Sequence, residues 1–290
     1  MEFDLSQLRA LSVTVSEGTF EAAARRLHVT PSAVSQRIKA LESAVGSVLL
    51  QRTKPVEVTE SGQAVLRLAR QIEILTADTH RELGDELDDG RPASVPIAVN
   101  ADSLATWILP ALAALPPGTV FDLHLDDQDH TTALLRSGAV MAAVTAVARP
   151  IQGCTSSRLG TMRYRARCSA EFAARWFPEG ATPAALAVAP VVVFDTKDDL
   201  QDAFLRRAGR RRADPPRQFV PSSADFVRAV ELGLGWGMIP DLQASDRLVE
   251  LDPAGDATDV ALYWQQWQLR SATLDRVAEA VREAATATLR

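Results

Sequence analysis

The sequence predicts an α/β protein in which a winged helix-turn-helix is followed by a long helix and then by two α/β lobes. Three features predict this order: a helix, a short turn and a helix with one polar face; a longer helix with a single apolar seam; and strand-like runs that alternate with helical ones. With 290 residues, 47% hydrophobic and 23% charged, the chain has the length and composition of a globular protein of two or more domains.

The apolar segments, the cysteines and the net charge exclude several classes of protein. The N-terminus MEFDLSQLRA lacks an apolar run of signal-peptide length, and no later segment offers about 18 uninterrupted apolar residues, so we expect a cytoplasmic protein without a membrane partner. Cys154 and Cys168 lack the spacing of a metal site, and both are expected to be buried structural residues. The formal net charge of −6 argues against a protein that coats nucleic acid over its whole surface.

A helix-turn-helix is expected near the N-terminus. Thr19 can cap a first helix over Phe20–Leu27. His28–Pro31 then makes a short turn, and Pro31 suits the first turn of a second helix over Ser32–Val45. The apolar stripe of the second helix consists of Val34, Ile38, Leu41 and Val45.

The opposite face of the second helix carries small or hydrogen-bonding side chains, which suits a helix that reads the major groove of DNA. Between Glu21 and Lys54, six basic residues against two acids leave an excess of +4 in an acidic chain, which points to phosphate. An ordinary amphipathic surface helix is the alternative, and the agreement of caps, turn, face and charge disfavours it. The candidate DNA-binding residues are Arg25, Arg26, Ser32, Ser35, Gln36, Arg37, Lys39, Arg52 and Lys54.

A wing and a long helix are expected next. The segment Leu49–Thr59 resembles a short two-stranded wing whose tip holds Arg52, Lys54 and Pro55. Thr59 can cap a helix that continues to about Leu87, and such a long helix with one apolar seam most often pairs with a copy of itself. The candidate dimerisation residues are Val65, Leu68, Ile72 and Leu75.

The N-terminal part, up to the end of the long helix, resembles the LysR-type transcriptional regulators. The string SAVSQRIKALE is similar to the form found in the ArgP/LysG branch, which takes its name from the control of basic amino acid export. The strings IAVNADSLATW, LDDQDHT, GCTSSRLGTMRY and GLGWGMIP extend the resemblance over essentially the whole chain. Many LysR-type proteins have Arg where this chain has Gln36 and Gln where it has Arg37, so the base contacts of these two residues are not carried over from the family.

The C-terminal part reads as two α/β lobes after an acidic hinge at Gly84–Ser94. Strands are expected over Val95–Asn100, Val120–Asp126, Val140–Val147, Val191–Phe194, Gln218–Pro221 and Ala261–Gln268. Helices are expected from Ser103, from His130, over Asp198–Ala208, over Ala224–Leu232 and from Leu274. Two similar lobes imply a cleft between them.

The resemblance implies domain boundaries. It predicts a winged helix-turn-helix over residues 1–60, a linker and dimerisation helix with its hinge over 61–91, and an effector-binding domain over 92–290. The effector-binding domain of this family is similar to a periplasmic solute-binding protein, in which the chain crosses twice between lobes. The crossings expected near Arg163–Cys168 and Tyr263–Gln268 give lobe I about 92–164 and 267–290, and lobe II about 165–266.

A ligand is expected at the carboxyl ends of the strands, where open α/β sheets bind small molecules. The loop after the first strand leads into a helix N-terminus that can hold a carboxylate, and acids after the second strand favour a cation. A ligand with both charges is a basic amino acid. For each residue alone, a role as helix cap or turn residue is the alternative. The candidate effector-binding residues are Asn100, Asp102, Ser103, Thr106, Asp127, His130, Thr145 and Ser222.

We therefore expect a regulator that binds double-stranded promoter DNA as a homodimer or tetramer, senses a basic amino acid (lysine, arginine or histidine) and works with RNA polymerase. The sequence contains no GxSxG, Walker loop or GxGxxG motif, so neither a catalytic role nor a cofactor is expected. Two alternatives stay open. One is a DNA-bending regulator that binds constitutively with another effector or none, and the other is a small-molecule-binding protein or enzyme outside regulation.

Overall fold

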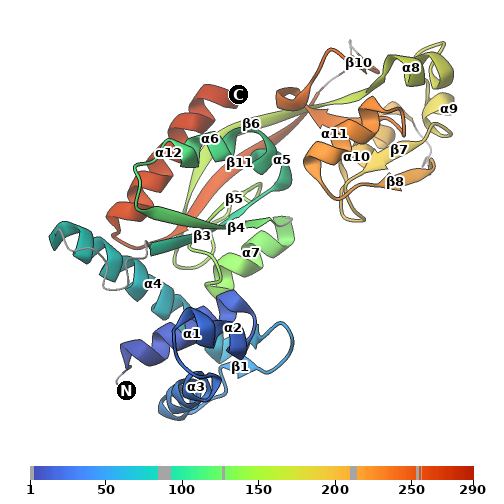
Figure 1. Cartoon of the computed structure of the whole chain (residues 1–290). Helices are drawn as coiled ribbons and strands as arrows, with labels where there is room; N and C mark the ends of the chain where they lie inside the picture. The colour runs from blue at the N-terminus through green and yellow to red at the C-terminus, as the bar shows by residue number, and fades with distance from the viewer. Residues whose placement is uncertain (1–2, 84–92, 126–127, 210–213, 253–254, 256) are drawn as a thin grey trace. The chain divides into compact units, whose positions relative to one another are not determined.

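The computed structural model describes residues 3–83, 93–125, 128–209, 214–252, 255 and 257–290. The contacts of the chain define two compact units. The first comprises Met1–Asn100, Ala111–Ser157 and Tyr263–Arg282, and the second comprises Ala101–Pro110, Arg158–Leu262 and Glu283–Arg290. Strands β6 (Cys154–Ser169) and β11 (Thr258–Trp267) run from one unit into the other. Figure 1 shows the order of elements along the chain.

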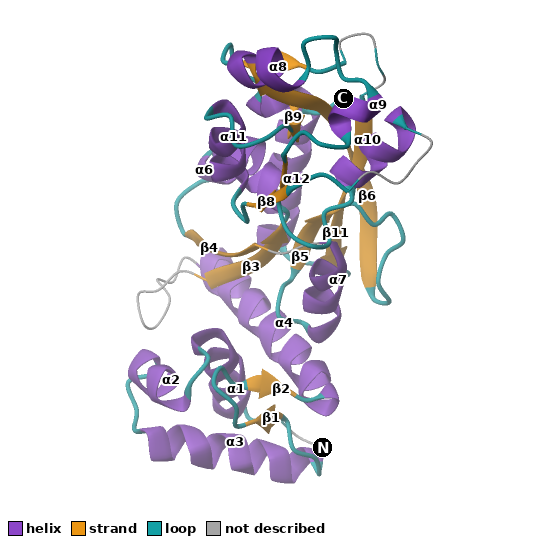
Figure 2. Ribbon diagram, turned by 90° about the vertical axis from the view of Figure 1, so that its right-hand side faces the viewer, coloured by secondary structure: helices purple, strands orange, loops and turns teal. Residues whose placement is uncertain are grey.

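The first unit begins with a winged helix-turn-helix. Its elements are α1 (Leu5–Glu17), α2 (Phe20–Arg26), α3 (Pro31–Val45), β1 (Leu50–Gln51) and β2 (Glu57–Val58). The predicted cap of α2 is present, because the hydroxyl of Thr19 accepts a hydrogen bond from the amide of Ala22 (3.2 Å). Thr30, which was expected in the turn, caps α3 by accepting a hydrogen bond from the amide of Ala33 (3.1 Å). β1 and β2 pair antiparallel as the predicted wing. Figure 2 shows α3 at the periphery of this unit.

Helix α1 was not predicted. Its cap is Asp4, whose carboxylate accepts hydrogen bonds from the amides of Ser6 (2.8 Å) and Gln7 (3.1 Å). It ends at Gly18, whose φ of 71° is a left-handed conformation that glycine adopts without strain. The helix contributes Leu8 and Leu11 to the core of the domain.

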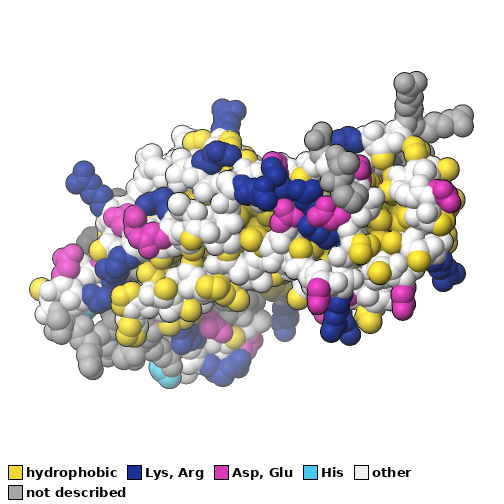
Figure 3. Space-filling model, turned by 90° about the horizontal axis from the view of Figure 1, so that it is seen from above, with side chains coloured by type: hydrophobic (Ala, Val, Ile, Leu, Met, Phe, Trp, Pro, Cys, Tyr) yellow, Lys and Arg dark blue, Asp and Glu magenta, His cyan; other side chains and the backbone are white. Residues whose placement is uncertain are grey.

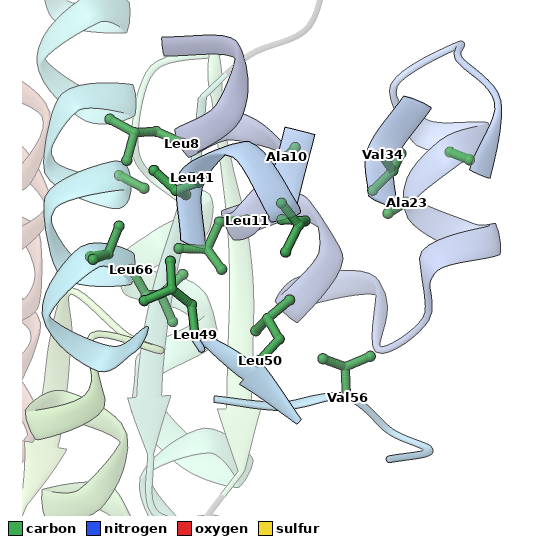
Figure 4. Close-up of a cluster of buried hydrophobic side chains, with 14 residues drawn as sticks. Leu8, Ala10, Leu11, Ala23, Val34, Leu41, Leu49, Leu50, Val56 and Leu66 are labelled. Carbon is green, nitrogen blue, oxygen red and sulfur yellow. The ribbon is translucent and has the colours of Figure 1, made fainter. Parts of the chain in front are cut away.

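A single apolar core holds the winged helix-turn-helix together, and Figure 4 shows it in close-up. Helix α1 supplies Leu11, α3 supplies Leu41, the wing supplies Leu49, and each of these side chains is fully buried. Leu66 of the long helix α4 (Glu60–Leu83) closes the same core. The first turns of α4 therefore belong to the DNA-binding domain as much as to the linker, because their burial depends on α1 and α3.

The four predicted dimerisation residues of α4 differ in how far they are buried within their own chain. Val65 is buried, and both it and Ile72 pack into the winged helix-turn-helix of their own chain. Leu68 is half-buried and Leu75 is 38% exposed. Val65 and Ile72 thus already contribute to the core of their own chain, where α1 packs against α4, and the dimer contact of the four residues stays a prediction.

The first unit continues with a sheet of strand order β11-β5-β3-β4. β3 (Ala93–Val99) pairs parallel with β4 (Thr119–Leu125) and with β5 (Ala142–Thr145), while β11 pairs antiparallel with β5. Ala93 and Ser94, expected in the hinge, already belong to β3, and residues 84–92 of that hinge lie outside the described part of the chain. Helices α7 (Gln128–Ser137) and α12 (Ala272–Thr288) complete the predicted alternation.

The second unit is built on β6, which pairs antiparallel with β9 (Gly237–Pro240) and with β10 (Leu248–Glu250). A parallel pair, β7 (Val191–Val193) and β8 (Arg217–Phe219), lies in the same unit. Helices α8 (Ala170–Trp176), α9 (Pro183–Leu186), α10 (Leu200–Ala208) and α11 (Ser223–Glu231) accompany these strands. Strand β6, with β9 and β10, was not predicted as a strand.

The helix expected to start at Ser103 starts two residues earlier. Its segments are α5 (Ala101–Ser103), a π-helical stretch (Leu104–Ile108) and α6 (Leu109–Ala113). π-helical stretches are uncommon and frequently occur at functional sites. Among the described residues, no helix is long and apolar enough to cross a bilayer.

Candidate functional site

The two faces of α3 separate as the sequence predicts. Val34, Ile38 and Leu41 are buried against the core of the domain. The candidate base-reading residues on the other side are Ser32, Gln36 and Lys39, which are exposed, with Ser35 and Arg37, which are half-buried. Because the apolar stripe fixes the rotation of the helix, Ser32, Ser35, Gln36 and Lys39 are presented together on its outer side. Arg37 lies at the edge of the apolar stripe, where its charge acts on Asp4.

The tip of the wing is tied to α3. The guanidinium of Arg52 donates a hydrogen bond to the hydroxyl of Ser35 (3.3 Å) and lies 5.2 Å from the centre of the Phe20 ring. Arg52 is still exposed, as is Lys54. The wing cation is therefore held beside the reading helix and can reach a phosphate next to the bases that α3 would contact.

The basic residues of α2 lie in its last turn. Arg25 and Arg26 are both exposed. The Arg26 guanidinium is 3.8 Å from the Glu17 carboxylate, in a pair that water screens on both sides. Cations at the end of the first helix suit contacts to the DNA backbone.

A polar cluster surrounds Asp102 in the second unit. One carboxylate oxygen of Asp102 accepts a hydrogen bond from the Tyr164 hydroxyl (2.7 Å), and the other accepts one from the Ser223 hydroxyl (2.7 Å). The Ser223 hydroxyl also lies 3.1 Å from the side-chain oxygen of Gln243. We call Asp102, Tyr164, Ser223 and Gln243 the Asp102 cluster. Its members come from α5, β6, α11 and the segment after β9.

Tyr164 is a fixed proton donor in this cluster. It is buried, and that burial, together with the negative charge of Asp102, raises the pKa of its hydroxyl well above the ordinary value. A hydroxyl that stays protonated can keep donating to Asp102. The carboxylate is thereby held in one orientation, and its remaining lone pairs are free to accept donors from a ligand.

Three other candidates lie in the second unit, and two of them have local roles. Ser103 is fully buried, and its hydroxyl has no partner among the described residues. The Thr106 hydroxyl donates its proton to the backbone carbonyl of Asp102 (2.5 Å), so it cannot donate that proton to a ligand as well. Ser222 caps α11 by accepting a hydrogen bond from the Asp225 amide (3.4 Å), and its neighbour Ser223 is the residue that contacts Asp102.

Asn100 and Thr145 belong to the first unit. They follow β3 and end β5, which are parallel neighbours, so both lie at the carboxyl ends of their strands as expected. The side-chain oxygen of Asn100 has no partner among the residues described, and Thr145 is buried. Asp127 and the side chain of His130 lie outside the described part of the chain.

Sequence reasoning did not single out Tyr164 or Gln243, and it chose Ser222 over Ser223. Tyr164 is 62 residues from Asp102, and Ser223 is 121 residues away. No local pattern places residues at such separations together. The sequence did contain a usable signal, the pair Ser222–Ser223 at the start of a helix. The first hydroxyl caps the helix, so the second is available for another contact.

The two cysteines are buried, as predicted. Burial raises the pKa of the Cys154 thiol to about 11 and that of the Cys168 thiol to about 12. Both groups stay protonated near neutral pH, and a thiol is a far weaker nucleophile and metal ligand than a thiolate.

Comparison with known proteins gives matches over both parts of the chain. Residues 5–63 match the model of the bacterial regulatory helix-turn-helix proteins of the lysR family, and residues 89–286 match that of the LysR substrate binding domain. The chain is 43% identical over 288 residues to the HTH-type transcriptional regulator LysG of Mycobacterium tuberculosis, covering 98% of this chain and 94% of that protein. It is 40% identical over 300 residues to the lysine export transcriptional regulatory protein LysG of Corynebacterium glutamicum, covering 98% of each chain.

Solved structures give the same result. The crystal structure of ArgP from Mycobacterium tuberculosis has a TM-score of 0.84 and 43% identity to this chain, over 100% of this chain and 99% of the other. Full-length LysG from Corynebacterium glutamicum with its bound effector Arg has a TM-score of 0.73 and 38% identity, over 99% and 100% of the two chains. Both likenesses extend over the DNA-binding and C-terminal parts alike.

Proposed function

Since the chain belongs to the LysR family of bacterial helix-turn-helix regulators, we propose that it is a DNA-binding transcriptional regulator whose effector is a basic amino acid. The observation that supports an effector with an amino group is Asp102, and a relative with bound arginine supports a basic one. The Asp102 carboxylate is held by two hydroxyls, and the described residues include no cation paired with it. A partly buried carboxylate without a protein cation is a natural partner for the positive charge of a ligand.

The likeness to a relative supports this choice. LysG from Corynebacterium glutamicum, 38% identical over nearly the whole chain, has been solved with arginine as its bound effector. The curated relative of the same organism is a regulator of lysine export. We propose that this chain senses a ligand of the same class, with one carboxylate and more than one positive charge.

We propose that the protein acts by binding DNA, an effector and other proteins, and not by catalysis. α3 and the wing bind promoter DNA, a homodimer or tetramer brings two reading helices to one site, and RNA polymerase is the proposed protein partner. What supports the DNA part is the presentation of Gln36 and Lys39 on the outer face of α3 beside Arg52.

The effector assignment predicts a preference that calorimetry on the full chain can measure. Lysine should bind at least about tenfold more tightly than norleucine, which has a similar length but no distal cation, because a carboxylate left unpaired costs more than about 1.4 kcal/mol. Asp102→Asn should weaken both ligands, since each carries an α-ammonium group. Equal affinity for lysine and norleucine, or none for either, would remove the basic amino acid and leave a LysR-family regulator with another effector.

The DNA-binding assignment predicts two kinds of variant. Gln36→Ala should cost about 1–3 kcal/mol at a specific site and little on unrelated duplexes, because a base-edge contact is lost. Arg52→Ala should weaken all duplexes about equally and flatten the salt dependence, because a phosphate contact is lost. Titrations on specific and unrelated duplexes at several salt concentrations separate the two. A uniform loss for Gln36→Ala would show that α3 does not read bases there.

A further inference from the structure

A second half-buried carboxylate, Asp198, lies near the Asp102 cluster. It follows β7, and β7 pairs parallel with β8 in a register that sets Val193 beside Phe219. Ser223 follows β8 and donates to Asp102. Because the carboxyl ends of parallel strands meet at one edge, the segment of Asp198 and the segment of Ser223 leave the sheet on the same side.

The contacts of Asp198 hold its carboxylate in place without neutralising it. One oxygen accepts a hydrogen bond from the Phe194 amide (3.0 Å) and the other from the Leu200 amide (3.2 Å). Burial raises the pKa of Asp198, and the negative charge of Asp102 raises it further, while these hydrogen bonds and one from Gln201 oppose the shift. The negative charge of Asp102 therefore acts on the Asp198 carboxyl.

Gln201 adds an acceptor that nothing in the described structure uses. Its side chain is 1% exposed, and its amide group stabilises the ionised carboxylate of Asp198. The side-chain oxygen of Gln201 is buried and has no hydrogen-bond donor among the described residues. A buried amide oxygen without a donor is costly, so its position beside a carboxylate points to a donor that arrives from outside the chain.

Three arginines of the second unit are paired with other acids. Arg163 pairs with Asp259 (2.7 Å), Arg167 with Asp241 (2.6 Å), and Arg217 with Asp202 (2.6 Å). On the face drawn in Figure 3, a group of basic side chains near the middle lies beside acidic ones. The described residues show no ion pair for Asp102 or for Asp198, so two negative charges remain for a ligand to balance.

We propose that Asp198 and the side-chain oxygen of Gln201 form the subsite for the distal cation of the effector, while Asp102 receives its α-ammonium group. An ammonium group offers three donors and a guanidinium group five, enough to reach the carboxylate and the amide oxygen together. This inference rests on the proposed function, because it divides the two positive charges of a basic amino acid between two carboxylates. The competing account is that Asp198 only fixes its own loop through Phe194 and Leu200.

The test is Asp198→Asn in the full chain, with calorimetric titrations of lysine, norleucine, arginine and citrulline. Citrulline is the neutral analogue of arginine, as norleucine is of lysine. The variant should bind lysine and arginine at least about tenfold more weakly than the wild type, and the neutral analogues within about twofold. Asp199→Asn is the matched control, since Asp199 is exposed and pairs with Arg206, and it should leave all four affinities unchanged.

A second variant is needed because Asp198→Asn could also change the conformation of the loop that Asp198 holds. Gln201→Met keeps the size of the side chain and removes the free acceptor, so it should weaken lysine more than norleucine. The inference is overturned if the wild type prefers lysine and both variants keep that preference, and the proposed function then stands. If the wild type shows no preference for charged ligands, the proposed function itself fails.

Discussion

Asp78→Ala is expected to lower the free energy of unfolding by on the order of 3 kcal/mol, the largest stability loss foreseen for a single polar side chain of this protein. Asp78 lies on α4 and is buried. Its carboxylate accepts hydrogen bonds from the hydroxyls of Ser271 (2.6 Å) and Thr273 (2.5 Å), at the start of α12, and from Arg81 (2.7 Å). Removal leaves buried donors unsatisfied and frees α12 from the linker helix within the first unit.

Denaturant unfolding of the full chain, followed by tryptophan fluorescence, measures the loss. Asp275→Ala is the matched control, because Asp275 is also an acid at the start of α12 but is exposed. The control should change the free energy of unfolding by no more than about 0.5 kcal/mol. Equal losses for the two variants would mean that the Asp78 bridge does not stabilise the unit.

The same bridge should depend on pH in a defined direction. Burial opposes ionisation of Asp78, but the hydrogen bonds from Ser271, Thr273 and Arg81 outweigh it and lower the pKa of the carboxyl in the folded protein. A lowered pKa contributes stability that is present above the unfolded-state pKa and is lost as pH falls through the folded-state pKa. The difference in stability between wild type and Asp78→Ala should therefore shrink on acidification.

The sequence predicted those parts of the fold that local patterns specify. The face of α3 followed from the spacing of Val34, Ile38 and Leu41, because a helix repeats every 3.6 residues whatever surrounds it. Strand β6 carried a usable signal as well. Arg163, Arg165 and Arg167 alternate with apolar residues along it, which is the period of a strand with two different faces.

The candidate site was predictable only in part. Asp102 could be chosen because it follows the first strand, where ligands of open α/β sheets bind. Its partners could not, because Tyr164 and Ser223 reach it through long-range contacts that depend on the order of the strands. The packing of Val65 and Ile72 against their own domain could not be predicted either, since it depends on α1, a helix that was not predicted.

The linker helix gives the last prediction. If α4 forms the dimer, the surface available to a second copy is the face of Leu68 and Leu75. These two residues share one side of the helix and are not part of the apolar core of the winged helix-turn-helix. Asp at both positions would bury unpaired charge in the dimer and leave the monomer folded. A variant at Ile72 could lose the dimer or simply unfold, because Ile72 also packs on the winged helix-turn-helix.

Leu68→Asp combined with Leu75→Asp should therefore weaken the dimer at least about a hundredfold and shift the sedimenting species to the mass of the monomer. DNA affinity should fall with it, because a monomer presents one reading helix where a dimer presents two. Leu5→Asp is the control: Leu5 is 62% exposed at the start of α1, so the same change there adds a charge without touching the α4 face. Thermal unfolding of the double variant should remain cooperative, although its midpoint lacks the contribution of the dimer. A double variant that keeps the wild-type mass in solution would place the interface of this regulator on another surface.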